Sequence, residues 1–473
     1  MSSSSDRLAA EDVLLFANAA ITATGQREFH AEQGRQRLSL DFLHEYMLGN
    51  YRELYAAMLA LEINDHNAVL IVRRLLESAR EATGEQRRTE GRLIARRLEL
   101  LPPQRVYRLF RELRAAGVNN RRTRAIIRDW LATRPDPAFD AVKYRSAVKT
   151  ALRHAHLPAA GAETGDFLFA PRRRKHFDTP LLEAWRRAHY EKAAIYELPY
   201  TVAEGFAVEH RIDRAVFLER IAPRLTQLEQ LRLQESAQRL DASALRTDLS
   251  RMSLTCLASY VLSLSLDDRA RRRAELTDAL CAAARRTAGA QRGRWGRVAA
   301  VLDDSFSSFG SVVKRRRPLA VALACHHLLQ VLAREYVPLW TSGRDDALLG
   351  YPYGATPLGH RIIDALDTAP DRVVIVSDGW DNAPPGLAAE VLRVWRGVLD
   401  PDGRVDVVHL NPVFDAENFE VRRVSAVTPT AGIRNAEDLP ALVELAHFAT
   451  GRTELSELTV HLADRAATFV QSR

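Results

Sequence analysis

Five oxygen-bearing side chains stand at the ends of two apolar runs and at the start of one helical pattern. The stretch VLDDSFSSFG, residues 301–310, contains Asp303, Ser305 and Ser307 in the pattern D-x-S-x-S. Thr356 lies in GATPLG before a helical pattern, and Asp378 in SDG follows a second apolar run. Two carboxylates and three hydroxyls suit a hard octahedral cation that keeps part of its water, Mg²⁺ or Mn²⁺ rather than Zn²⁺. We expect the serines to bind the ion directly and the acids to hold metal-bound waters.

The elements that must position these side chains alternate between strand and helix. Apolar runs of strand length occur at 297–304, 336–342, 372–379 and 404–412, and helical stretches separate them at 318–335, after 356 and at 386–399. This alternation is typical of a parallel, doubly wound α/β sheet with helices on both faces. Ligands of such sheets bind at the carboxyl ends of the strands, so the three motifs should lie along one edge.

The three motifs, in this order and at these spacings, resemble the von Willebrand factor A domain and its metal-ion-dependent adhesion site, over residues 295 to 473. The resemblance implies that the remaining metal position is left for an acidic group, Asp or Glu, of a protein partner. Phe306 departs from the family pattern, because many members carry Gly there. The resemblance implies that Ser305, Ser307 and Thr356 bind the ion directly through their hydroxyls. It also implies that Asp303 and Asp378 bind it mostly through water. The alternative is that these acids and serines only cap turns.

Before residue 293 the apolar periodicity is helical. In residues 103–117, Val106, Leu109, Phe110 and Leu113 recur at three- and four-residue spacing, and the pattern is repeated in 118–136. Further helices are expected at 40–62, 66–82, 139–155, 180–195, 214–239 and 243–265. These patterns favour an all-α helical-repeat domain of stacked antiparallel helices, HEAT-like, over an irregular bundle, although no consensus recurs at a fixed period.

The charge distribution suggests where one domain ends and the next begins. Residues 1–300 hold 50 Lys and Arg against 37 Asp and Glu, whereas residues 301–473 hold 17 against 23. A basic part beside an acidic part predicts a boundary near residue 293. The expected organisation is a partly flexible N-terminal segment at 1–38, the helical domain at 39–292 and the von Willebrand A-like domain at 293–473. We expect the last of these to fold alone.

A helical repeat followed by such a domain resembles the Ro family, ring-shaped proteins with TROVE and von Willebrand A domains that bind small non-coding RNA. The resemblance implies a non-enzymatic ribonucleoprotein scaffold. The same metal-site domain also serves in magnesium-chelatase-like and MoxR-associated complexes, where it docks acidic partners beside a AAA ATPase. A protein-interaction adaptor that works without RNA is therefore the second hypothesis.

RNA binding is favoured by 20 basic against 10 acidic residues between 101 and 200, because neutralised phosphates release counterions. The alternative is a solvated helix surface in an Arg-rich protein. A second basic run, 313–318, either attracts an acidic ligand toward the metal motif or is solvated. The candidate RNA contacts are Arg105, Arg108, Arg121, Arg124, Arg128, Arg172, Arg173, Arg174 and Lys175.

The sequence argues against an enzyme, a cysteine-based framework and a membrane-spanning or secreted protein. No G-x-S-x-G, Walker, G-x-G-x-x-G or H-E-x-x-H motif occurs, which argues against an enzyme. Three scattered cysteines, Cys256, Cys281 and Cys325, predict neither a disulfide framework nor a thiolate metal site. The apolar run at 13–21 follows acids and has no basic flank, so it resembles neither a signal peptide nor a spanning helix. We expect a cytoplasmic protein with no membrane partner.

Overall fold

The computed structural model describes residues 4–28, 32–226, 229–230, 233, 248–450 and 453–472. The chain forms two compact units, which we call the α/β unit, residues 1–71 with 249–473, and the helical unit, residues 72–248. This division differs from the three consecutive segments expected from the sequence. The expected boundaries after residues 38 and 292 both lie inside the α/β unit.

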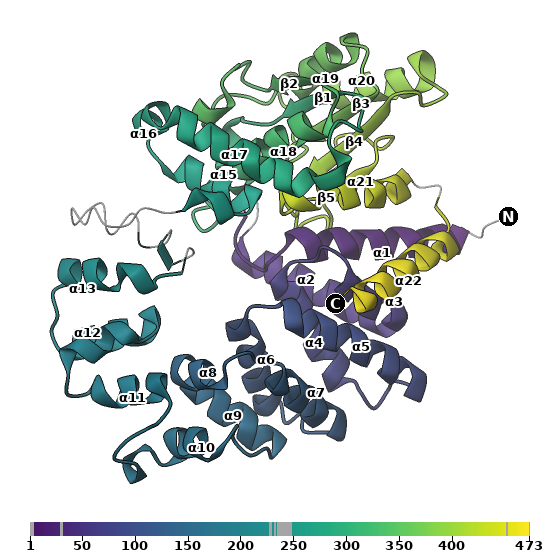
Figure 1. The fold of residues 1–473 in the computed structure, drawn as a ribbon. Coiled ribbons are helices and arrows are strands. Elements are labelled where there is room, and N and C mark those ends of the chain that lie inside the picture. The colour runs from purple at the N-terminus through teal and green to yellow at the C-terminus, as the bar shows by residue number, and fades with distance from the viewer. Residues whose placement is uncertain are drawn as a thin grey trace. The chain divides into compact units, whose positions relative to one another are not determined.

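The α/β unit is built on a five-stranded parallel sheet (Figure 1). Its strand order is β2-β1-β3-β4-β5. The strands are β1 (Arg297–Leu302), β2 (Glu335–Trp340), β3 (Arg372–Val376), β4 (Asp406–Asn411) and β5 (Thr430–Gly432). The first four coincide with the four predicted apolar runs. The short strand β5 was not predicted. β1 and β3 are neighbours in the sheet, with Leu302 opposite Val376.

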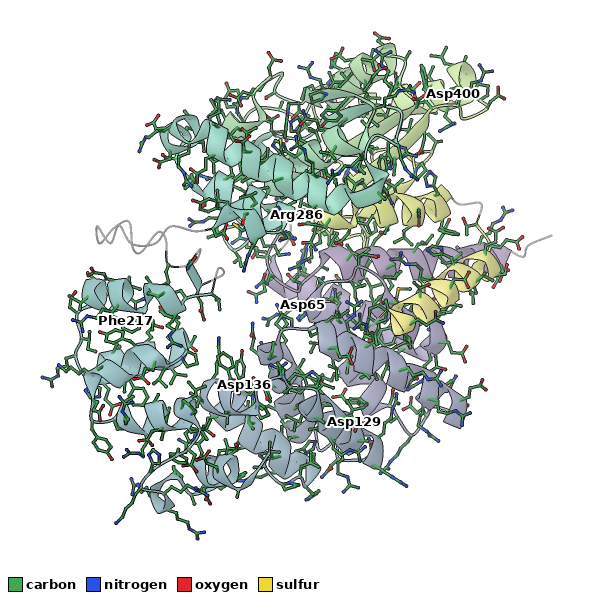
Figure 2. The ribbon with its side chains drawn as sticks, in the orientation of Figure 1. Asp65, Asp129, Asp136, Phe217, Arg286 and Asp400 are labelled. Carbon is green, nitrogen blue, oxygen red and sulfur yellow. The ribbon has the colours of Figure 1, made fainter. Side chains whose placement is uncertain are left out.

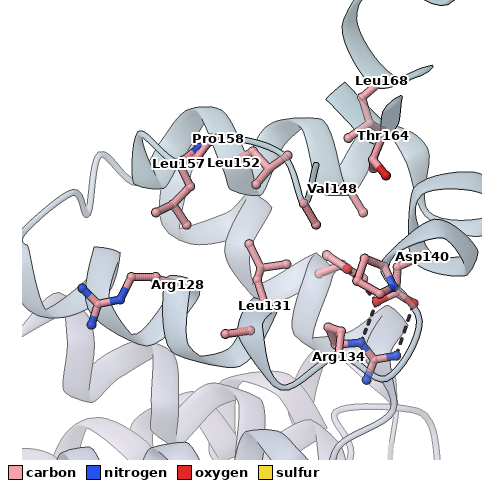
Figure 3. A pocket seen from close by; sticks show the side chains of 14 residues that line it. Arg128, Leu131, Arg134, Asp140, Val148, Leu152, Leu157, Pro158, Thr164 and Leu168 are labelled. Atoms are coloured by element: carbon pink, nitrogen blue, oxygen red, sulfur yellow. Dashed lines mark hydrogen bonds and ion pairs between the residues drawn. The ribbon is translucent and has the colours of Figure 1, made fainter. Parts of the chain in front are cut away.

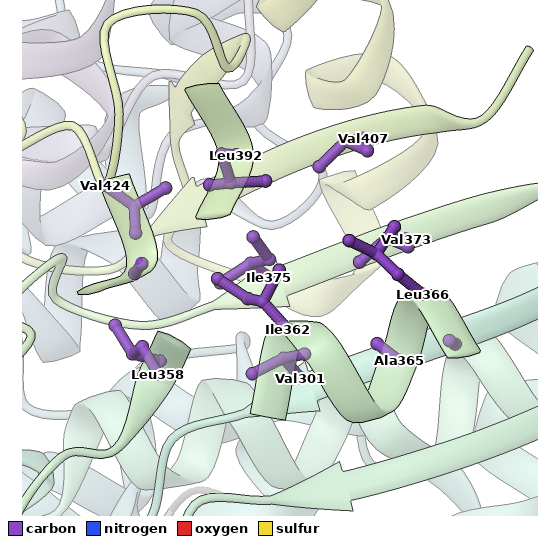
Figure 4. Packing of buried hydrophobic residues seen from close by; sticks show 12 residues of the cluster. Val301, Leu358, Ile362, Ala365, Leu366, Val373, Ile375, Leu392, Val407 and Val424 are labelled. Carbon is purple, nitrogen blue, oxygen red and sulfur yellow. The ribbon is translucent and has the colours of Figure 1, made fainter. Parts of the chain in front are cut away.

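One face of the sheet is covered by α19 (Leu358–Asp367) and α20 (Leu387–Val394). Alternate strand residues point toward these helices because side chains in a strand alternate between its two faces. Figure 4 shows the resulting apolar cluster. It consists of buried residues from β1, β3, β4, the two helices and one loop: Ala299, Val301, Leu358, Ile362, Ala365, Leu366, Val373, Ile375, Ala388, Leu392, Val407 and Val424.

The other face is covered by α18 (Arg317–Leu332) and α21 (Leu439–His447). A further layer packs on α18, formed by α15 (Leu254–Ser263) and α17 (Arg273–Ala288), with the short α16 (Leu266–Arg271) between them. Residues 249–292 therefore belong with the sheet, although the sequence had assigned them to the helical domain.

The N-terminal residues complete this cover. The helix α1 (Ser4–Thr22) packs on β5, and its residues Phe16 and Ile21 are fully buried. The C-terminal helix α22 (Leu455–Gln471) packs on α1 and α3. The other members of this group are α2 (Gln33–Asn50), α3 (Arg52–Ala57) and the 3₁₀ turn η1 (Met58–Ala60). The described part of the expected flexible segment is thus mostly helix that packs against the sheet and its neighbours.

The helical unit consists of successive short helices (Figure 1). Asn120 and Asp136 begin two of them, because their side-chain oxygens accept the N–H of Thr123 at 2.9 Å and of Phe139 at 2.8 Å. Figure 2 marks Asp136 at the start of its helix. The helices are α5 (Gly84–Leu100), α6 (Pro103–Ala115), α7 (Arg121–Ala132), α8 (Pro137–Lys143), α9 (Arg145–Ala155), α10 (Ala162–Phe169), α11 (Pro180–Arg187), α12 (Tyr200–Glu209) and α13 (Arg214–Ile221). The boundary between the units falls within α4 (Asp65–Glu77).

Several expected helices differ from those observed. The helix expected at 40–62 is interrupted at Tyr51, between α2 and α3, and the helix expected at 180–195 ends at Arg187. The single helix expected at 139–155 is two helices, because Tyr144 adopts φ −118° and ψ 30° between them. The helix expected at 214–239 ends at Ile221, and most of its remainder lies outside the described residues. Likewise 243–247, the start of the helix expected at 243–265, lie outside them, and α15 begins at Leu254.

Candidate metal-ion site and basic surfaces

The carboxyl ends of β1 and β3 place Asp303 and Asp378 next to each other. The two strands are neighbours, and the N–H of Asp303 continues their ladder by donating to the carbonyl of Val376 at 3.0 Å. Both carboxylates are buried, with exposed fractions of 4% and 5%, and they interact electrostatically. Two acids that are 75 positions apart in the chain thus form one pair at the sheet edge.

Hydrogen bonds from three elements hold the Asp303 carboxylate. The backbone N–H of Ser305 donates to Oδ1 at 2.9 Å, and the hydroxyl of Thr341, just after β2, lies 3.3 Å from the same oxygen and shares its one proton between Asp303 and Asp304. The hydroxyl of Ser377, just after β3, donates to Oδ2 at 2.9 Å. The orientation of Asp303 therefore depends on the ends of three neighbouring strands.

Asp378 is positioned by a tight turn. The N–H of Trp380 donates to its Oδ1 at 3.0 Å, and the Ser307 side chain also donates a hydrogen bond to this carboxylate. Between them, Gly379 has φ +79°, and a Cβ on it would lie 2.7 Å from the carbonyl oxygen of Arg422. Only glycine fits both this backbone conformation and this close contact.

Ser305 and Ser307 bring their hydroxyls together beside the two acids. Their Oγ atoms lie 3.3 Å apart. Ser305 is fully buried, whereas Ser307 is partly exposed. The 3₁₀ turn η7 (Phe306–Phe309) accounts for this proximity, because its tight backbone returns the second serine to the side of the first.

The loop that carries Thr356 is tied to both acidic segments. The N–H of Phe306 donates to the carbonyl of Gly354 at 3.0 Å. The N–H of Thr356 donates to the side-chain oxygen of Asn382 at 2.7 Å, and Thr356 is buried. One set of bonds thus joins this loop to the serine motif, and the other joins it to the segment after Asp378.

The electrostatics of the pair favour a cation. Burial and the negative charge of Asp378 raise the pKa of Asp303 to about 7. Burial also raises the pKa of Asp378, against the opposing effects of the Ser307 hydrogen bond and the Arg422 charge. Ionising both of two buried, interacting carboxylates costs free energy unless a positive charge compensates them. All side-chain atoms of the site that could bind a metal ion are oxygens, so the residues present fit Mg²⁺ or Mn²⁺.

The neighbouring acid Asp304 has a different role. Its Oδ1 accepts from the hydroxyl of Thr341 at 2.9 Å and from the N–H of Ser342 at 2.9 Å, and its Oδ2 accepts from the Ser342 hydroxyl at 2.6 Å. These bonds fasten the end of β1 to the end of β2. Asp304 therefore supports the site and is not one of its candidate ligands.

Sequence reasoning missed the two supporting hydroxyls, Thr341 and Ser377. Each directly follows a strand at the same sheet edge as Asp303. That position was the available signal. The partner of each hydroxyl, however, depends on strand order, which the sequence motifs do not contain.

The basic run 313–318 has a structural role. The ammonium group of Lys314 pairs with Glu28, and both side chains are largely buried. The guanidinium of Arg316 donates to the carbonyl of Leu262, and that of Arg317 donates to the carbonyl of Arg434 at 2.6 Å. The run therefore joins the segment after η7 to three other parts of the α/β unit. Simple solvation does not describe these three cations, and attraction of an acidic ligand by the run stays a prediction.

The predicted RNA-binding residues lie on two parts of the helical unit. Arg105 and Arg108 are on α6, and Arg121, Arg124 and Arg128 are on α7. The remaining four lie in and just after the 3₁₀ turn η2 (Pro171–Arg173). Acidic partners are seen for Arg108 with Glu112, Arg128 with Asp129 and Arg174 with Asp166.

A cavity of about 420 Å³ also occurs in the helical unit (Figure 3). Its lining is mainly apolar, with Leu131 facing Leu152 and Leu157. At one end, Arg134 and the hydroxyl of Tyr107 both donate to the Asp140 carboxylate, so these polar groups satisfy one another.

No protein-family model matches the chain, and the search of curated proteins finds no match either. None of the helices in the described ranges combines the length and the apolar composition that a bilayer crossing requires.

Proposed function

We propose that the α/β unit is a von Willebrand A-type domain that binds one Mg²⁺ or Mn²⁺ and uses it to capture an acidic group of a protein partner. The observation that carries this proposal is the buried pair Asp303 and Asp378, set beside the hydroxyls of Ser305 and Ser307 at the carboxyl edge of a parallel sheet. Such an edge is where doubly wound sheets bind ligands. A neutral serine or threonine ligand leaves charge on the ion that a partner's carboxylate neutralises.

Exposed aromatic residues around the site support a protein partner. Phe306 and Tyr353 are 63% and 62% exposed, and Tyr351 and Trp380 are also exposed. All four stand on the loops that carry the acids, the serines and Thr356. Clustered exposed aromatic groups are typical of interaction surfaces. Two cations lie over these rings. The guanidinium carbon of Arg344 is 3.6 Å from the ring centroid of Tyr351, and that of Arg422 is 3.7 Å from the ring centroid of Trp380.

We further propose that the helical unit binds RNA, which would make the whole chain a Ro-like, non-enzymatic ribonucleoprotein scaffold. The supporting observation is a group of exposed cations after α10. Arg172, Arg173 and Lys175 are exposed and form no ion pair with any described residue. Cations without acidic neighbours are available to phosphates, and their contacts release counterions.

The competing function is a metal-dependent adaptor that works beside a AAA ATPase without RNA. It requires only the metal site and its aromatic surroundings. The two functions differ in electrostatics, because RNA binding depends on the helical unit and on salt, whereas capture of a carboxylate depends on the ion.

Parallel pull-downs from native lysate distinguish these functions. The baits are the parent protein, Asp303→Ala and a triple change of Arg172, Arg173 and Lys175 to Ala, and both RNA and protein are analysed. A scaffold enriches RNA with the parent and with Asp303→Ala, and loses RNA with the triple variant. An adaptor enriches proteins that Asp303→Ala loses. If the parent enriches no RNA at low salt, the scaffold function is excluded. If the parent and Asp303→Ala enrich the same proteins, the adaptor function is excluded.

A further inference from the structure

Phe169 is an exposed aromatic residue in a unit that buries most of its phenylalanines. It is the last residue of α10 and is 42% exposed, whereas Phe110, Phe167 and Phe177 are fully buried. Exposure of a phenyl ring loses the free energy that its burial would provide, roughly 1.5–3 kcal/mol for a large apolar side chain. An exposed ring is thus informative when its surroundings also suggest a ligand.

Two cations of the preceding helix lie over this ring. Lys149 Nζ is 5.8 Å and Arg153 Cζ is 5.3 Å from the ring centroid. They are four residues apart on α9, which places them on the same helix face. Cations near an aromatic face are attracted to it, so the ring also helps to position the two charges.

Further cations follow Phe169 within six residues of the chain. Arg172, Arg173 and Lys175 are exposed, in and just after η2. Together with Lys149 and Arg153 they make five cations. None of these forms an ion pair with a residue in the described ranges. Arg174, by contrast, pairs with Asp166 at 2.6 Å. We call the five cations and the ring the Phe169 cluster.

We infer that the Phe169 cluster binds unpaired nucleotides of single-stranded RNA: the phosphates draw Lys149 and Arg153 from over the ring, and a base stacks on the ring in their place. This inference rests on the proposed RNA-binding function and deepens it. An exposed ring within a group of cations offers both interactions of a single-strand site, since every base has a π-face and every nucleotide carries a charge. In a duplex the bases are already stacked, so a duplex uses only the cations.

Fluorescence anisotropy of the full chain with labelled 12-nucleotide oligoadenylate, and with a 12-base-pair RNA duplex, tests the inference. The parent should bind the single strand more tightly than the duplex at equal salt. Phe169→Leu should weaken single-strand binding by about 5- to 150-fold, the equivalent of about 1–3 kcal/mol for one stacked base. Phe169→Trp should restore it. Tyr190→Leu removes another exposed aromatic residue of the same unit and should change nothing.

The salt dependence separates stacking from charge. Phe169→Leu should leave the slope of log affinity against log salt unchanged, because no charge is removed. Arg172→Ala should reduce the slope by about one unit. A 2-aminopurine in the oligonucleotide should be quenched on binding to the parent and not to Phe169→Leu.

The outcomes distinguish failure of the inference from failure of the RNA-binding proposal. If the parent binds neither RNA at low salt, the proposed RNA function fails and the inference fails with it. If the parent binds RNA but Phe169→Leu binds the single strand as the parent does, the stacking site is wrong and RNA binding stands. Equal competition by polyglutamate of the same charge would also overturn the inference, because it would show a site for any polyanion.

Discussion

The backbone N–H of Gly432 in β5 donates a 2.8 Å hydrogen bond to Oδ1 of Asn18 in α1, and both residues are buried. A residue near the start of the chain thus completes the backbone pairing of the last strand of the sheet. The two elements also pack closely, because a Cβ on Gly432 would lie 2.7 Å from Cγ2 of Thr22 and 3.0 Å from the carbonyl oxygen of Asn18. The sheet therefore depends on the N-terminal helix for its cover.

This contact predicts that Gly432→Ala destabilises the protein. The added methyl group must push α1 away from β5, and overpacking of this kind costs roughly 1–3 kcal/mol of unfolding free energy. Urea unfolding followed by circular dichroism measures the change. The matched control is Gly397→Ala, whose new Cβ would meet nothing within 4 Å. Equal stability of the two variants would contradict the α1–β5 packing.

The buried ion pair of Glu28 and Lys314 gives a second prediction. Burial raises the pKa of Glu28 and lowers that of Lys314, so each charge depends on the other for compensation. Glu28→Gln or Lys314→Met alone should each lower the unfolding free energy by roughly 3–5 kcal/mol. The double variant should lose much less than the sum, since no unpaired charge remains. A double-mutant cycle by urea unfolding measures this coupling, and additive losses would show that the pair does not form.

A third prediction concerns acid stability and the buried His409. Its Nε2 lies 3.1 Å from the carbonyl of Ser377 and its Nδ1 lies 3.3 Å from Oγ1 of Thr430. Burial lowers the pKa of His409 to about 4, against about 6.5 for an unfolded histidine. Between these pH values the unfolded chain binds a proton that the native protein does not. The stability that neutral His409 contributes is therefore complete above pH 6.5 and is lost as the pH falls toward 4, by about 3 kcal/mol.

Replacing His409 should remove this part of the pH dependence. The measured quantity is the unfolding free energy of His409→Gln and of the parent at several pH values from 7 to 4. The variant should lose less stability than the parent on acidification. His360→Gln changes an exposed histidine and should follow the parent. A variant whose curve runs parallel to that of the parent would show that His409 binds its proton equally well in the folded and unfolded states, which would contradict the lowered pKa.

Sequence patterns were sufficient where an element is decided locally. The runs that became β1, β3 and β4 are continuous apolar segments between polar residues, which is typical of strands buried on both faces. The helices α6 and α7 show regular apolar spacing with a Pro or Asn at their start. These signals need no knowledge of what the element packs against.

Other features depend on contacts that no local pattern contains. The strand β5 has only three residues, Thr-Ala-Gly, and exists because β4 pairs with it and α1 covers it. The apolar side of α1 indicates that the helix is buried but not that its neighbour lies some 400 residues later in the chain. For the same reason the shift in charge near residue 293 did not coincide with a boundary between compact units.

The candidate site was predictable in part. The sequence placed Asp303 and Asp378 at strand ends, and the structure brings them together because β1 and β3 are neighbours. The binding partners of the basic run 313–318 were not predictable, because they are mostly backbone carbonyls supplied by distant segments. A cluster of cations in a sequence is usually solvated, and only the tertiary contacts show otherwise.

Isothermal calorimetry with Mn²⁺ tests the metal site most directly. The account predicts about one ion per chain for the parent and none for Asp303→Ala or Asp378→Ala, with folds intact by circular dichroism. Ser305→Ala should weaken binding less than either acid variant, because water can replace a neutral ligand. Asp402→Ala is the control, since this exposed carboxylate precedes β4, at the other end of the strands, and its variant should bind the ion as the parent does. Unchanged Mn²⁺ binding in both Asp303→Ala and Asp378→Ala would contradict the assignment.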